Sequence, residues 1–182
     1  MKKMLAILLS MLMIFSLAAC SKGQPDDRRD PEEGNRPGEA GNMQIGNPWV
    51  DCATLDEAAK VAGFDIAIPG KFEGYSNKVY QAIEKTMIQV FYYDGDPEAD
   101  ESSRITVRKG TGSDDISGDY NEYSEKETLE IHGIDVLAKG EKGKIYCATW
   151  TKDGYSFAIV ADNGLTKEAL SNAIEEMIVV VG

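Results

Sequence analysis

Apolar and polar residues alternate through most of the chain from Tyr75 to Phe157, and a period of two is typical of strands with one buried face. The alternating runs are 78–84, 87–93, 104–108, 127–131, 134–139, 144–151 and 155–161. The pairs His132-Gly133 and Asp153-Gly154 fit tight hairpin turns, whereas longer polar loops interrupt the pattern elsewhere. The pattern predicts an antiparallel sheet in meander order.

Helical spacing flanks the alternating region at both ends. Thr54 and Glu57 have the spacing of a capping box and begin a predicted helix that ends at Gly63. Thr166 can cap a last helix. The apolar residues of each helix share one face: Leu55, Ala58, Ala59 and Ala62 in the first, and Leu170, Ala173, Ile174, Met177 and Val181 in the last. The run from Phe64 to Ile68 predicts a further strand.

These elements predict the fold class. We expect an α+β domain in which a curved antiparallel β-sheet, a meander of about six to seven strands, is packed by an N-terminal and a C-terminal helix. The composition of residues 47–182 is sufficient for a single core of ordinary domain size.

The first residues have the layout of a signal peptide. Lys2 and Lys3 precede an apolar run that is shorter than the roughly 20 residues of a membrane-spanning helix. The tetrad Leu17-Ala18-Ala19-Cys20 looks like the lipobox of bacterial lipoproteins, which implies cleavage after residues 1–19 and acyl chains such as palmitate on Cys20. We therefore expect a lipid anchor on the outer, extracytoplasmic face of the cell membrane. An ordinary secretory signal is the alternative.

Residues 20–46 are predicted to be a flexible tether. They contain three prolines, interleaved charges and almost no large apolar residue, so they cannot order themselves by burial. About 26 flexible residues have a mean reach of roughly 28 Å.

Removal of Lys2 and Lys3 changes the net charge from −12 to −14, which disfavours nucleic acid as a partner. Such a charge favours cations or cationic peptides as partners, or it serves solubility alone.

Two cysteines remain once Cys20 carries lipid. Cys52 and Cys147 are a possible disulfide in an oxidising location. Cys147 alternates with apolar neighbours and Cys52 precedes a helix, so two buried free thiols are the alternative.

An acidic loop is the candidate metal site. Four acids stand at alternate positions, as in a calcium loop: Asp94, Asp96, Glu98 and Asp100. However, Ala99 stands where such a loop has its turning glycine, and Ile105 where it has its closing glutamate. A solvated hairpin loop is the alternative.

The motifs of common enzymes are missing from the sequence. The one histidine, His132, lies in a predicted turn and has no motif partner for nucleophilic catalysis. Gly110-Thr111-Gly112-Ser113 lacks the lysine of a phosphate-binding loop. We expect no enzymatic activity and no cofactor.

Aromatic residues offer another route to binding. Those that could line a cleft for lipid, glycan or peptide are Trp49, Trp150, Tyr80, Tyr92, Tyr93, Tyr146, Tyr155 and Phe157. Most are expected in the core, because they stand at alternate strand positions. Tyr92 and Tyr93 nevertheless point to opposite faces, so both faces of the sheet carry apolar groups and a partner can cover one of them.

The domain also resembles an uncharacterised family found in lipoproteins of Gram-positive bacteria and on the outer side of membrane-bound anti-sigma factors. The matching residues are Asn47-Pro48-Trp49-Val50, Ala58-Ala59, Ala62-Gly63-Phe64, Ile66, Ile68, Pro69, Ala148-Thr149-Trp150, Gly154-Tyr155, Phe157, Leu165 and Ala169-Leu170. The resemblance covers 47–181 and implies a curved antiparallel sheet packed by helices, without an established activity. Because lipid replaces the transmembrane helix, we expect no direct anti-sigma role.

Together these features predict a lipid-anchored, non-catalytic binding or sensory module of the cell envelope. Its expected partner, besides the membrane, is an envelope protein, a peptide or a polymer. A carrier or chaperone for a lipid or hydrophobic peptide is one alternative. An envelope hydrolase that uses scattered carboxylates is the other.

Overall fold

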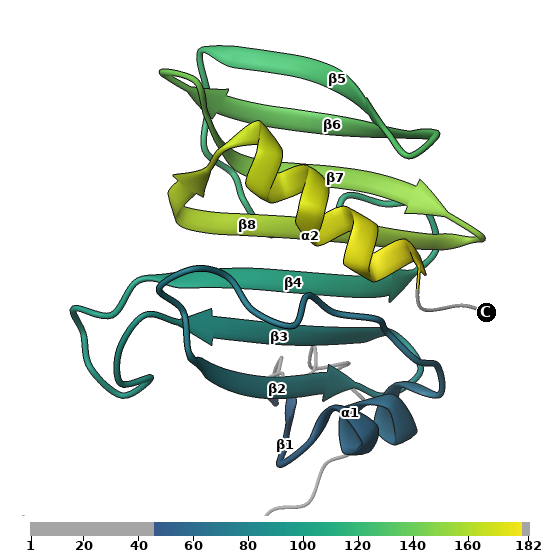
Figure 1. Ribbon diagram of the computed structural model, residues 1–182. Coiled ribbons are helices and arrows are strands. Elements are labelled where there is room, and N and C mark those ends of the chain that lie inside the picture. The colour runs from purple at the N-terminus through teal and green to yellow at the C-terminus, as the bar shows by residue number, and fades with distance from the viewer. Residues whose placement is uncertain (1–45, 180–182) are drawn as a thin grey trace, which may run out of the picture. The chain divides into compact units, whose positions relative to one another are not determined.

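The computed structural model of the protein describes residues 46–179, which form eight strands and two helices (Figure 1). The strands are β1 (Val50–Cys52), β2 (Asn77–Ile83), β3 (Met87–Tyr93), β4 (Arg104–Thr111), β5 (Glu125–Ile131), β6 (Ile134–Glu141), β7 (Lys144–Lys152) and β8 (Tyr155–Leu165). The helices are α1 (Leu55–Ala62) and α2 (Lys167–Val179). The predicted signal peptide, Cys20 and the predicted tether before Gly46 lie outside the described residues.

All eight strands belong to one antiparallel sheet in the order β1-β2-β3-β4-β8-β7-β6-β5. The predicted α+β class is confirmed, although the sheet has eight strands instead of about six to seven. Its order also differs from a simple meander. The β1–β4 meander and the β5–β8 meander join through β4 and β8, because loop 112–124 carries the chain from β4 to the far edge.

The predicted strand at 64–68 is wrong, since this segment is irregular in the structure. It buries Ile66, and the carbonyl oxygen of the following Pro69 accepts a hydrogen bond from the hydroxyl of buried Tyr92 at 2.6 Å. The alternation of residues 64–68 therefore arises because one side of the segment is buried, although within the described residues the segment pairs with no strand. The pattern also missed β1, because its three residues are exposed or half-buried and show no apolar alternation.

The main core lies on one face of the sheet, which we call the helix face. Its buried residues include Ala82, Ile88, Val90, Tyr92, Ile105, Val107, Val136, Ala138, Ala148, Trp150, Ile159 and Ala161. α1 packs against β1, β2 and β3, whereas α2 packs against β5, β7 and β8, as Figure 1 shows for β7 and β8. α1 thus covers the side of the helix face formed by β1–β3, and α2 covers the side formed by β5, β7 and β8.

Loop 112–124 packs on the opposite face, which we call the loop face. Arg108 points to this face and donates from Nη1 to the carbonyl oxygens of Ile116, at 3.0 Å, and Ser117. The hydroxyl of Ser156 donates to the Gly112 carbonyl at 3.1 Å. The loop is therefore fixed to β4 and β8 by polar contacts.

The predicted local signals are confirmed at the helix start and the turns. The Glu57 amide donates to Thr54 Oγ1 at 3.2 Å, and the Glu57 carboxylate accepts from the Ala53 amide at 2.8 Å. His132 and Gly133 have φ values of 50° and 76°, as a type I′ hairpin turn requires.

Candidate functional site

A cleft of about 790 Å³ opens on the helix face beside the end of β4. Its lining comes from the irregular segment after α1, from β4, from the β7–β8 turn and from the end of α2. The residues are Phe64, Asp65, Ile66, Ala67, Lys109, Lys152, Asp153, Tyr155, Phe157, Met177 and Ile178. We call it the Lys109 cleft, because this lysine lies among its aromatic side chains.

The ammonium group of Lys109 lies over three aromatic rings. Its distance to the ring centroid is 4.1 Å for Tyr155, 5.3 Å for Phe64 and 5.7 Å for Phe157. The ammonium also donates to the carbonyl oxygen of Asp65 at 2.6 Å. Each cation–π contact contributes about 0.5–1 kcal/mol at an exposed site and more when desolvated. Lys109 therefore links the irregular segment to the sheet.

The charge of Lys109 has little direct compensation. Burial lowers the pKa of Lys109, while the negative charges of Asp65 and Asp153 act in the opposite direction. Within residues 46–179 the ammonium has one hydrogen bond and no carboxylate at ion-pair distance. An ammonium group has three donors, so the remaining ones can serve an acceptor oxygen in the cleft.

Sequence reasoning missed Lys109, although one signal pointed to it. Ile105, Val107 and Lys109 occupy alternate positions of β4 and so share the helix face. A lysine on an otherwise apolar register is unusual, but the predicted strand stopped at Arg108. The segment that supplies Phe64 and Asp65 was predicted as a strand, so its place over the sheet end was missed too.

Of the eight aromatic candidates, the structure brings Tyr155 and Phe157 into the cleft. Trp150 is buried and stacks on Phe157 with ring centroids 5.3 Å apart. The other five lie elsewhere: Tyr92 in the core, Tyr80 packed against it, Tyr93 beside Phe91, Tyr146 stacked on Tyr123 and Trp49 facing Arg108. Two of the eight thus line this cleft with Phe64, whereas Tyr92 and Trp150 are buried in the core, as expected for most of the set.

Cys52 and Cys147 are free thiols in the structure, so the possible disulfide is not formed. They lie on β1 and β7, five strand positions apart in the sheet order, which corresponds to roughly 24 Å. That separation is far beyond the reach of a disulfide.

Cys147 is buried, and burial raises the pKa of its thiol to about 11. Cys52 is half-buried; burial first, and then Glu57 and Asp51, raise the pKa of its thiol.

The acidic loop stabilises its own backbone. The Asp94 carboxylate accepts from the Ser103 amide at 2.8 Å, and the Asp96 carboxylate accepts from the Glu98 amide at 2.9 Å. Glu98 and Asp100 are exposed. Among the residues that the structure describes, no three His, Cys, Asp or Glu side chains are grouped to hold a metal ion. The hydrogen bonds of Asp94 and Asp96 thus serve the turn of the loop itself, and calcium binding by the four acids stays a prediction.

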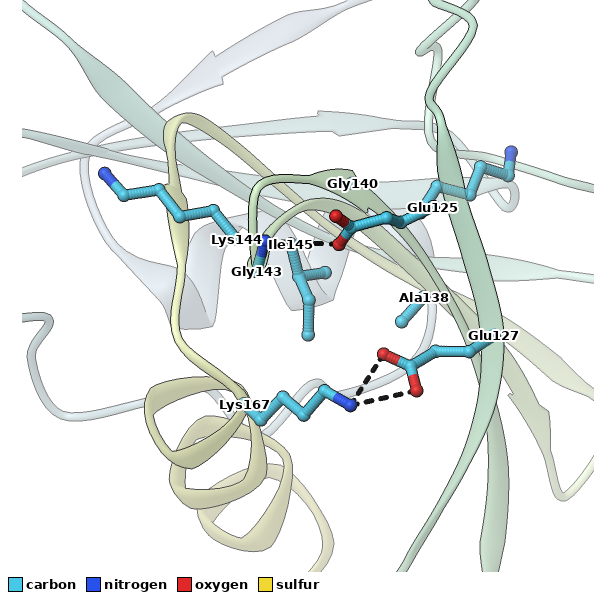
Figure 2. Close-up of a pocket in the computed structure, with 9 residues that line it drawn as sticks. Glu125, Glu127, Ala138, Gly140, Gly143, Lys144, Ile145 and Lys167 are labelled. Carbon is cyan, nitrogen blue, oxygen red and sulfur yellow. Dashed lines mark hydrogen bonds and ion pairs between the residues drawn. The ribbon is translucent and has the colours of Figure 1, made fainter.

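A second, much smaller pocket lies between β5, β6 and the start of α2 (Figure 2). Its volume of about 20 Å³ has room for a single water. Lys167 pairs with both carboxylate oxygens of Glu127, at 2.8 and 2.9 Å, and the Gly143 amide donates to Glu125 at 3.2 Å. These contacts fix β5 to α2 and to the β6–β7 turn.

None of the family models, curated proteins or solved structures that were compared with the chain matches it. The chemistry of the Lys109 cleft must therefore be read from its own residues. Over residues 46–179, neither helix has the length and apolar character needed to cross a bilayer.

Proposed function

We propose that the protein is a lipid-anchored, non-catalytic binding module on the outer face of a bacterial cell membrane, and that the Lys109 cleft binds its ligand. The observation that carries the proposal is the half-buried Lys109 ammonium, which lies among three aromatic rings and keeps donors for an acceptor oxygen. The anchor on Cys20 and the tether belong to the proposal on the strength of the sequence.

A sugar ring offers the features that this cleft complements. The flat C–H face of a sugar can stack on Tyr155 or Phe157, while its hydroxyl or carbonyl oxygens accept from Lys109. Asp153 also lines the cleft, and its carboxylate, which accepts from Lys152 Nζ at 2.6 Å, has further lone pairs for a sugar hydroxyl. We therefore propose a glycan of the cell envelope as the ligand.

The lining favours this ligand over an acyl chain. Four charged residues line the cleft: Asp65, Lys109, Lys152 and Asp153. An acyl chain would desolvate these charges and offer them no hydrogen bonds, which is unfavourable. The carrier alternative therefore has less support than the binding module.

Calorimetric titration of the full-length protein with soluble saccharides from peptidoglycan tests the proposal. Lys109→Met keeps the length of the side chain but removes the donors, and Tyr155→Ala removes stacking surface. Each variant should weaken binding by about tenfold or more, as expected for residues at the centre of a site. Lys85→Met is the matched control, because Lys85 is exposed in the β2–β3 turn, away from the cleft lining.

Two outcomes would contradict the proposal. In the first, no saccharide binds. In the second, Lys109→Met binds the saccharide as tightly as the wild type does. Binding of a free stem peptide, without the saccharide, would change the ligand class from glycan to peptide.

A further inference from the structure

β5 is an edge strand, and the hairpin that joins it to β6 determines which of its backbone groups bond to β6 and which point outward. A type I′ turn at His132 and Gly133 joins β5 to β6, and Ile131 pairs with Ile134 beside it. In a two-residue hairpin, the flanking pair exchanges both backbone hydrogen bonds, and every second pair repeats this. Leu129, Glu127 and Glu125 therefore bond to β6. The N–H and C=O groups of the residues between them point away from it.

Those outward-pointing residues are Lys126, Thr128 and Glu130, and all three are exposed. β5 is the last strand in the sheet order, so none of the strands in the described residues satisfies these groups. Glu125 and Glu127 connect this strand to the β6–β7 turn and to α2, as Figure 2 shows. A strand with free backbone groups along its outer edge is a template for another strand.

The side chains on this edge carry an unfavourable arrangement of charge. The register of β5 and β6 places Lys126 opposite Lys139 and Glu130 opposite Asp135. Like charges directly opposite each other destabilise a strand pair. Lys139 has partial compensation from Asp115, at 3.4 Å on loop 112–124. The hairpin thus presents a positive end and a negative end on the loop face.

From these observations we propose that β5 pairs with β5 of a second copy of this chain. The two strands run antiparallel about a two-fold axis at Thr128, and the two sheets become one continuous sheet. Thr128 then stands opposite Thr128 of the second copy, and Lys126 opposite its Glu130. The register satisfies the outward N–H and C=O groups of all three residues at once.

Charge complementarity is the reason for choosing a second copy as the partner. The two-fold axis places the positive end of each hairpin against the negative end of the other, which relieves both like-charge pairs. A single strand pairing buries a small area, so the contact is weak in dilute solution. A membrane anchor would raise the effective concentration of the copies and favour the pairing.

Sedimentation equilibrium of the full-length lipidated protein, in density-matched detergent, tests this pairing. The wild type should form dimers. Lys126→Glu and Glu130→Lys should each raise the dimer dissociation constant by about tenfold or more, because each creates two repulsive contacts across the axis. The double variant should dimerise more tightly than either single variant, since it restores two opposite-charge contacts between positions 126 and 130 across the axis. Lys85→Glu, an exposed reversal in another turn, should have no effect.

Thr128→Pro provides a second test that separates pairing from folding. Its missing N–H points outward, so the change removes bonds to the second copy and leaves those to β6 intact. We expect a monomer whose circular dichroism shows the same folded sheet as the wild type and whose thermal unfolding stays cooperative. Because the lipid is unchanged, this variant also controls for association through the acyl chains.

The proposal is wrong if the wild type is monomeric over the whole concentration range. It is also wrong if the double charge reversal stays as weak as the single variants, or if folded Thr128→Pro still dimerises. The last two results would place any dimer contact elsewhere on the molecule.

Discussion

Arg108 is the residue that holds loop 112–124 against the loop face of the sheet. It follows buried Val107 but points to the loop face, where its Nε donates to Gln89 Oε1 at 2.9 Å. Its Nη1 contacts loop 112–124, as described above. Burial, and secondarily the positive charge of Arg104, lowers the pKa of Arg108. One guanidinium therefore joins β3, β4 and the long loop.

Replacement of Arg108 by lysine should destabilise the domain by about 1–3 kcal/mol, because an ammonium cannot make the forked set of contacts and leaves acceptors unsatisfied. Urea unfolding followed by circular dichroism measures this loss. Arg104→Lys is the matched control on the same strand. Arg104 is exposed, so its change should stay within about 0.5 kcal/mol. An equal effect at both positions would contradict the assigned role of Arg108.

Cys147 should make stability depend on alkaline pH. The folded pKa of about 11 lies above the ordinary value of 9.0, so the folded state keeps a proton that the unfolded chain loses in this window. Stability therefore falls as pH rises from 9 towards 11. Urea unfolding of the wild type and Cys147→Ala, below pH 9 and near pH 11, checks this. The variant should lose less stability than the wild type over the same interval.

At the scale of elements, β6 depends on a glycine. The β6–β7 register shifts between Lys139 and Gly140, which marks a β-bulge. A Cβ on Gly140 would overlap the carbonyl oxygen of Lys144, and a backbone atom cannot move aside cheaply. The bulge therefore requires glycine at this position for steric reasons.

Gly140→Ala should consequently cost at least about 2 kcal/mol of stability, through overpacking against the backbone. Thermal unfolding of the variant gives the measurement. Gly46→Ala is the control, because a Cβ there would meet open space and its φ is ordinary. If both variants melt with the wild type, the bulge tolerates a side chain and the interpretation fails.

Signals from residues close together in the sequence predicted most helices, strands and turns. The pairings between strands that are far apart in the sequence were missed. The Thr54 cap, the type I′ turn and the strands β2 to β8 all follow from residues close together in sequence. A period of two reveals which residues share a face, but it does not reveal which strands are neighbours. The β4–β8 pairing and the crossing of loop 112–124 therefore could not be read from the pattern.

The Lys109 cleft was missed for the same reason. Its rings come from Phe64 after α1 and from Tyr155 and Phe157 on β8, and they meet at Lys109 only because β8 pairs with β4. The aromatic candidates can be read from the residues alone, but the sheet order decides which of them meet at Lys109.

For the whole molecule, the proposed anchor is the main functional determinant outside the described residues. Cys20→Ala should move the protein from the membrane fraction to the soluble fraction or stall its processing, because two acyl chains give stable binding. Cell fractionation with immunoblotting measures this. Cys52→Ala is the matched control and should stay with membranes. Incorporation of labelled palmitate into the Cys20→Ala variant would contradict the proposed attachment.

The central place of β8 has a consequence for how the domain is made. Synthesis runs from the N-terminus, so β4 is complete long before the strand that pairs with its second edge. Until β8 exists, the half-finished chain exposes that edge with Ile105 and Val107, a template for aggregation. A chain that stopped after β7 would thus contain two unjoined parts of the sheet, β1–β4 and β5–β7, and the residues from Tyr155 onward decide whether these become one sheet.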